Sequence, residues 1–153
     1  LKNAKILNDQ KENFTRVIFV TTVNGIDQFE KFKNFRKMLD HKIEILLIGP
    51  IPNVNQFDPL KCLVRKSNCF MNIQNDYETR NLTLLDNKLN QLKKEKNVNV
   101  FFPYNYLCKN QKKKCTIYNK NTDLLTHRDG SHLTAEGSLI LVKPLNDFIK
   151  KNY

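Results

Sequence analysis

The sequence predicts an α/β fold built on a parallel sheet. Two β-branched, almost continuously apolar stretches, residues 15–23 and 43–49, are typical of strands that are covered on both faces. An amphipathic helical pattern at residues 27–42 lies between them, which completes a strand–helix–strand unit and requires parallel strands with a right-handed crossover. A second helical pattern at residues 76–96 and a short apolar stretch at residues 98–102 repeat the unit.

The first predicted strand and helix have the strongest patterns. TRVIFVTTV, residues 15–23, is typical of a central strand of a parallel sheet rather than of an edge strand with one wet side. In the helix that follows, apolar side chains recur at steps of three and four residues, so one stripe faces the sheet and the lysines face water. The stripe consists of Phe29, Phe32, Phe35 and Leu39.

Residues 50–72 are expected to be irregular. Pro50, Pro52 and Pro59 would each break a helix or a strand. The first two cysteines of the chain also lie in this stretch. We therefore expect it to form an excursion outside the sheet.

Two further helices complete the expected order of elements. Leucines recur in three-four-three steps between residues 76 and 96, and the strand at residues 98–102 follows. Thr134 as N-cap, Glu136 in the first turn and basic residues at the end predict a C-terminal helix, which Pro144 would kink. The apolar positions are Leu82, Leu85, Leu89 and Leu92 in the first helix, and Leu141, Leu145 and Phe148 in the second.

Length and composition favour one globular domain, residues 1–153, because 153 residues with 40% apolar content can bury a single core. The net charge of +11 predicts a solvated, lysine-rich surface, with attraction to polyanions as the alternative. No nucleic-acid partner is expected, because the basic residues are scattered apart from residues 109–114 and no nucleic-acid-binding motif is visible. The longest nearly apolar run, residues 45–52, is too short to span a bilayer.

The four cysteines fall into two pairs, Cys62 with Cys69 and Cys108 with Cys115, each with six residues between its members. This spacing does not fit a zinc site, whose neighbouring ligands are about two residues apart, so no metal is expected. Two local disulfides are favoured, each stabilising the fold by about 2–3 kcal/mol. Because disulfides persist in oxidising compartments, we expect an extracytoplasmic domain; four reduced cysteines in a cytosolic protein are the alternative.

An aspartate and a histidine three residues apart, Asp129 and His132, form the candidate catalytic pair. Open α/β sheets place active sites in loops beyond strand ends, and this glycine-containing loop precedes the last helix. A carboxylate on Nδ1 would orient the imidazole and leave Nε2 free to act as a general base. The alternative is an Asx turn that caps the helix. His127 has no carboxylate at the same spacing and is expected to face solvent.

DGSHLTAEGS, the sequence around this pair, resembles the D-x-x-H block that closes SGNH-type (GDSL-like) serine hydrolases. It resembles more closely the form in SGNH domains appended to membrane O-acyltransferases of the acyltransferase-3 family, which modify envelope glycans. IEILLIGPIPNV resembles that family's strand and G-P-x-P turn, PLKC its cysteine after a proline, and LCKNQKKKC its cysteine loop. These matches span about residues 43–149. The resemblance implies a three-layer α/β/α fold of flavodoxin-like type.

One block of the family does not occur in these residues. The nucleophilic serine of SGNH enzymes follows a Gly-Asp pair, and none of Ser67, Ser131 and Ser138 does. We therefore expect an N-terminally truncated chain, the C-terminal portion of a single SGNH-like domain, with the serine upstream. The resemblance also offers Asn24, after the first strand, as an oxyanion-hole residue; a simple turn residue is the alternative.

The resemblance implies covalent acyl transfer without a cofactor. A serine deprotonated by His132, with Asp129 holding the ring, would accept an acetyl or other small acyl group and pass it to an envelope polysaccharide. An upstream membrane domain would deliver the acyl donor and tether the domain on the extracytoplasmic side. A secreted SGNH esterase or lipase and a catalytically inactive glycan-binding domain are the alternatives.

Overall fold

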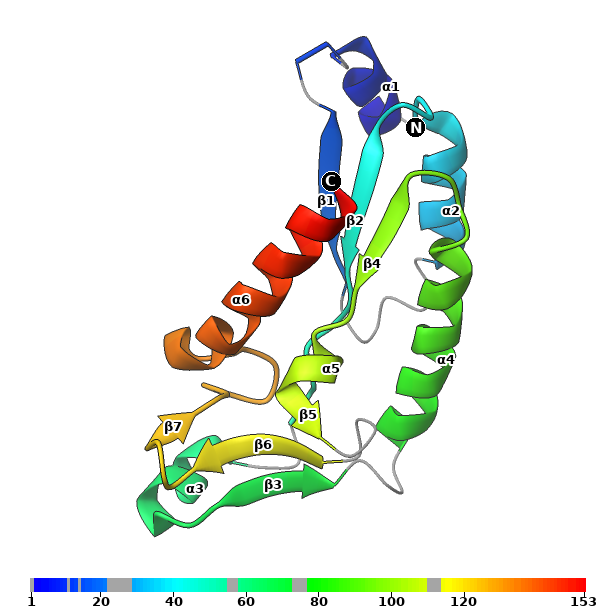
Figure 1. The fold of residues 1–153 in the computed structure, drawn as a ribbon. Coiled ribbons are helices and arrows are strands. Elements are labelled where there is room, and N and C mark those ends of the chain that lie inside the picture. The colour runs from blue at the N-terminus through cyan, green and yellow to red at the C-terminus, as the bar shows by residue number, and fades with distance from the viewer. Residues whose placement is uncertain are drawn as a thin grey trace. The chain divides into compact units, whose positions relative to one another are not determined.

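The structure, a computed structural model, describes residues 2–10, 12–13, 15–21, 29–54, 58–72, 77–109 and 114–153. The chain divides into two compact units (Figure 1). Unit 1 comprises residues 1–49 and 81–101, and unit 2 comprises residues 50–80 and 102–153. Within the described ranges, no helix combines the length and apolar character needed to cross a membrane.

Unit 1 is built on a three-stranded parallel sheet in the order β1-β2-β4, with Val17 opposite Ile45 and Leu47 opposite Val100. Because parallel neighbours need crossover connections, the strands alternate with helices along the chain. The predicted α/β class is confirmed. The elements are α1 (Lys2–Asp9), β1 (Arg16–Val20), α2 (Phe29–Met38), β2 (Glu44–Ile48), α4 (Tyr77–Leu92), whose first four residues belong to unit 2, and β4 (Val98–Phe101).

The apolar stripe of α2 packs against the sheet as predicted. The ring of Phe19 on β1 meets the rings of Phe32 and Phe35 edge-on, with centroid distances of 5.5 and 5.2 Å. Phe29 and Leu39 are also buried. α4 adds three buried leucines to unit 1, and burying an apolar side chain of this size stabilises a fold by about 1.5–3 kcal/mol. These leucines are Leu85, Leu89 and Leu92.

β1 differs from its predicted role as a central strand. Among the described residues it pairs with β2 alone, and the side chains of Ile18 and Val20 are 57% and 73% exposed. The prediction was wrong because an unbroken apolar run reports the character of the side chains and not the number of neighbouring strands.

Unit 2 contains an antiparallel sheet that the sequence did not predict, ordered β3-β6-β5, with β7 paired to β6. The expectation that residues 50–72 are irregular is therefore wrong in its second half. Pro59 begins α3, where its missing N–H has no intrahelical partner to lose, and Asp58 caps the helix by accepting the Leu60 N–H at 3.0 Å. The elements are α3 (Pro59–Arg65), β3 (Cys69–Asn72), α5 (Tyr104–Leu107), β5 (Cys108–Lys109), β6 (Lys114–Asn119), β7 (Leu124–Leu125) and α6 (Ala135–Asn152).

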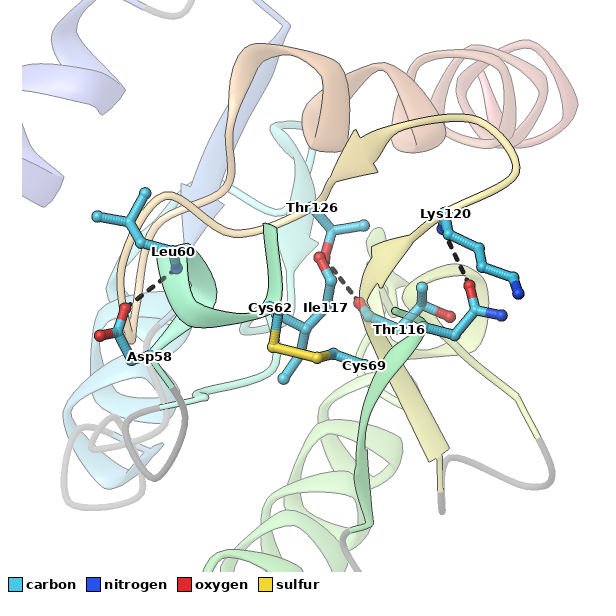
Figure 2. The surroundings of a disulfide bond; sticks show 9 residues. Asp58, Leu60, Cys62, Cys69, Thr116, Ile117, Lys120 and Thr126 are labelled. Carbon is cyan, nitrogen blue, oxygen red and sulfur yellow. Dashed lines mark hydrogen bonds between the residues drawn. A yellow bond between two sulfur atoms is a disulfide. The ribbon is translucent and has the colours of Figure 1, made fainter. Parts of the chain in front are cut away.

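Each disulfide closes a local loop of unit 2. Cys62 on α3 is bonded to Cys69, the first residue of β3 (Figure 2). Cys108 and Cys115 are bonded where they lie opposite each other across β5 and β6. The first bond therefore ties α3 to the antiparallel sheet, the second joins the strands β5 and β6 of that sheet, and no cysteine is left free.

The last helix, α6, begins at the predicted N-cap. The Thr134 hydroxyl oxygen accepts the Gly137 N–H at 2.8 Å, and the hydroxyl donates to the carbonyl of Leu125. The helix continues through Pro144 to its end. Gly137 is buried, and a Cβ atom there would overlap the carbonyl group of Thr126. The first turn of α6 thus rests directly on the backbone of the preceding loop.

Replacing Gly137 with alanine should destabilise the protein by about 2 kcal/mol, because the new methyl group would overlap the Thr126 carbonyl. Without that overlap, Gly137→Ala should instead stabilise the protein, since a helix interior favours alanine over glycine by about 1 kcal/mol. Urea unfolding measures the change, with Leu139→Ala at a 67% exposed position of α6 as the control. An unchanged or higher stability for Gly137→Ala would show that α6 does not rest on Thr126.

Candidate active site

Residues 126–134 form a closed loop between β7 and α6. The backbone N–H of Thr126 donates to a carbonyl of β6 at 2.8 Å, and its own carbonyl accepts the Thr134 N–H at 3.0 Å. Further into the loop, the Arg128 N–H donates to the carbonyl of His132 at 2.9 Å. These bonds hold the two ends of the loop together and leave only its tip outside them.

The carboxylate of Asp129 folds the tip of the loop. Its Oδ1 accepts the backbone N–H groups of Ser131 and His132, each at 2.9 Å. This is the Asx turn that the sequence offered as the alternative to a catalytic pair. The turn does not cap α6, because Thr134 is the N-cap of that helix.

The same carboxylate contacts the imidazole of His132. Nδ1 lies 2.9 Å from both Oδ1 and Oδ2 of Asp129, so the turn and the predicted side-chain pair are present together. The His132 and Asp129 side chains are 64% and 46% exposed. Nothing in the described part of the chain forms a hydrogen bond with Nε2.

The surroundings of Asp129 favour its ionised form. The backbone N–H of Ser131, and then the imidazole of His132, hold the pKa of Asp129 well below its ordinary value. Arg128 Nε also lies 3.6 Å from Oδ2. An ionised carboxylate can only accept hydrogen bonds, so Nδ1 must carry a proton toward it. The neutral ring then presents an unprotonated Nε2, which is the form a general base requires.

His127 is buried, and the prediction that it faces solvent is wrong. Its side chain is fully inaccessible, with Nε2 3.1 Å from the carbonyl oxygen of Pro52 and Nδ1 2.9 Å from Oγ1 of Thr126. Burial lowers the pKa of His127, although the Pro52 carbonyl and the charge of Asp129 act in the opposite direction. Spacing to a carboxylate could not reveal this environment, because its decisive partner lies 75 residues away.

No serine of this chain stands where a triad would need its nucleophile. Ser131 Oγ lies 3.3 Å from Nδ1, on the carboxylate side of the ring, and Ser138 Oγ donates to the carbonyl of Ala135 within α6. Ser67 is exposed beside α3. The oxyanion candidate Asn24 lies outside the described residues.

A cluster of metal ligands or a cavity is the other kind of feature that could form a site among the described residues. No three His, Cys, Asp or Glu side chains among them gather as a metal site would require. A cavity of about 870 Å³ lies within unit 1, beside β1, β2, α2 and α4, and its lining is largely apolar and contains no histidine or carboxylate. Among the described residues, the Asp–His pair of unit 2 is therefore the candidate site.

A family model described as "SGNH domain (fused to AT3 domains)" matches residues 3–147 of the chain. The chain belongs to this family. No curated protein and no solved structure matches it. In this SGNH domain, Asp129 and His132 are the first and last residues of a D-x-x-H sequence, and their side chains are in contact.

The contacts of Asp129 should make the stability of the SGNH domain depend on pH in the acid range. Because the native pKa of Asp129 lies below the value of about 3.9 for an unfolded aspartate, the unfolded state binds more protons between the two values. The stabilisation is thus complete above the unfolded-state pKa and is lost as pH falls through the native pKa.

Urea unfolding between pH 7 and pH 2 should therefore show a shallower pH dependence for Asp129→Asn than for the native protein. Asp147→Asn, on the exposed surface of α6, is the matched control. Identical pH profiles for Asp129→Asn and the native protein would contradict the contacts of this carboxylate.

Proposed function

We propose that this SGNH domain acts in covalent acyl transfer, moving an acetyl or other small acyl group to a cell-envelope glycan. Asp129 and His132 are its catalytic residues, and a serine outside these 153 residues is the nucleophile. Membership of a family fused to AT3 domains supports an acyltransferase association. The complete protein, rather than this chain alone, would carry out the reaction.

The observation that carries this proposal is the contact between the Asp129 carboxylate and Nδ1 of His132, at 2.9 Å to each oxygen. A carboxylate in this position fixes the orientation of the ring and stabilises the imidazolium ion that forms when Nε2 accepts a proton. The exposure of His132 supports access by a large substrate such as a polysaccharide.

The proposed reaction has two steps. In the first, His132 Nε2 takes the serine proton as the serine oxygen attacks the acyl carbonyl, and the proton then passes to the leaving group of the donor. In the second, Nε2 takes the proton of a sugar hydroxyl that attacks the acyl-serine, and returns it to the serine oxygen. Backbone amides, with Asn24 as a further candidate, would hold the oxyanion in both steps.

The proposed location is extracytoplasmic, with the domain tethered to the membrane through the rest of the protein. The two disulfides support an oxidising compartment. The family's fusion to AT3 domains supports the tether and a membrane source of the acyl donor. The net charge of +11 would favour an acidic glycan acceptor over a neutral one.

Esterase turnover by the complete protein tests the proposal. His132→Ala and Asp129→Asn should each lower kcat/KM on a chromogenic acetyl ester by about 10³-fold or more, because the base is removed or loses its orientation. The matched control is His41→Ala, an exposed histidine of unit 1, which should keep the native rate.

Near-native turnover by His132→Ala would contradict the base assignment. Product analysis separates the alternatives, because a transferase leaves the acyl group on the glycan whereas a secreted esterase releases the free acid. A native protein that binds glycan but never turns over an acyl donor would instead favour an inactive binding domain.

A further inference from the structure

A buried histidine lies two residues before the catalytic aspartate of the proposed site. His127 connects the active-site loop to a segment far away in the sequence, because its Nε2 lies 3.1 Å from the carbonyl oxygen of Pro52. Pro52 and Val54 are themselves buried, so this segment, residues 52–54, provides a fixed support. We call it the support segment.

Hydrogen-bond accounting assigns the proton of the His127 ring. Burial favours the neutral ring, which has a single N–H, and the Pro52 carbonyl can only accept. The contact with Pro52 therefore requires a proton on Nε2, and Nδ1 lies 2.9 Å from Oγ1 of Thr126. That hydroxyl oxygen also lies 2.7 Å from the carbonyl of Thr116 on β6 (Figure 2). Thr126 and His127 thus link the support segment to the antiparallel sheet.

A second bond connects the support segment to the tip of the loop. The backbone N–H of Val54 donates to the carbonyl of Gly130 at 2.7 Å. Gly130 follows Asp129 directly, and His127 lies two residues before Asp129. The backbone on both sides of Asp129 is therefore attached to the same support segment.

Burial does not hold the catalytic pair in place, since the side chains of Asp129 and His132 are 46% and 64% exposed. The Asx turn fixes these two residues only relative to each other. Their orientation relative to the rest of unit 2 depends on the attachments at each side of the turn. A displacement of about 1 Å at such a site can lower a rate by about 100-fold.

We infer that His127 is a positioning residue, which uses its Nε2–H on the Pro52 carbonyl to hold the support segment beneath the Asp129 turn and so keep the carboxylate aligned with His132. This inference rests on the proposed function, because the alignment matters only if His132 is the base. It assigns to the residue at 127 a donor role that an apolar side chain of equal size cannot fill.

Two variants separate this role from simple packing. His127→Phe keeps an aromatic ring in the cavity but has no donor, whereas His127→Gln can still donate an amide N–H toward Pro52. In the complete protein, His127→Phe should lower kcat on a chromogenic acetyl ester by about 10- to 100-fold with KM within about twofold. His127→Gln should recover most of that loss. If His127 only filled space, kcat would not fall in His127→Phe and recover in His127→Gln.

Hydrogen exchange provides a readout that does not need turnover. Peptides covering residues 50–54 and 126–134 should exchange faster in His127→Phe than in the native protein or His127→Gln, because the Val54 amide loses its fixed acceptor at Gly130 and the loop loses its attachment to the support segment. A peptide covering α2 is the control and should not change. If the native protein has no esterase activity, the proposed function fails, and exchange in these two peptides still decides whether His127 holds the loop.

Three results would overturn the inference: native kcat in His127→Phe, native exchange in both peptides of that variant, or equal loss of kcat in His127→Phe and His127→Gln. If His127→Phe does not fold, His127→Asn replaces it, because its amide is polar but too short to reach the Pro52 carbonyl. The same three results then apply to His127→Asn.

Discussion

The carboxylate of Asp129 joins the backbone of its loop to the ring of His132, and the proposed chemistry depends on this double contact. Oδ1 accepts two backbone N–H groups that form the turn, and both oxygens lie 2.9 Å from Nδ1. Forming an Asx turn and orienting a histidine are two different roles for an aspartate carboxylate. Here the turn brings the histidine back to the carboxylate, so the structural role also produces the side-chain contact that the proposed chemistry needs.

The rest of unit 2 holds that short loop at a defined place. Gly137 lets the first turn of α6 rest on the Thr126 backbone, and the Thr134 hydroxyl caps the helix at that point. One disulfide ties α3 to the antiparallel sheet, and the other joins the strands β5 and β6 of that sheet, which carries the carbonyls that accept from Thr126. The exposed pair therefore sits on a loop whose ends are fixed by backbone contacts rather than by burial of the side chains.

The sequence predicted those parts of the fold and site whose causes are local. The Asp129–His132 spacing, the Thr134 cap and the α2 stripe each involve residues within about one or two helical turns of one another. His127 was misassigned because its environment is set by Pro52, far away in the sequence. The start of α3 has a local signal, a capping aspartate followed by proline, although a proline by itself predicts a break as readily as a helix start. The antiparallel sheet had no comparable signal, since β3 and β6 come together from distant positions.

The tautomer of His132 tests the central contact most directly, because the Asp129 carboxylate can only accept and so requires the ring proton on Nδ1. Long-range ¹⁵N–¹H NMR spectra of protein labelled at histidine nitrogens report which ring nitrogen is protonated, and His132→Ala identifies the signal. At a pH where the ring is neutral, the account predicts a proton on Nδ1 in the native protein and loss of that preference in Asp129→Asn. A native His132 ring protonated at Nε2, with Nδ1 bare, would contradict it.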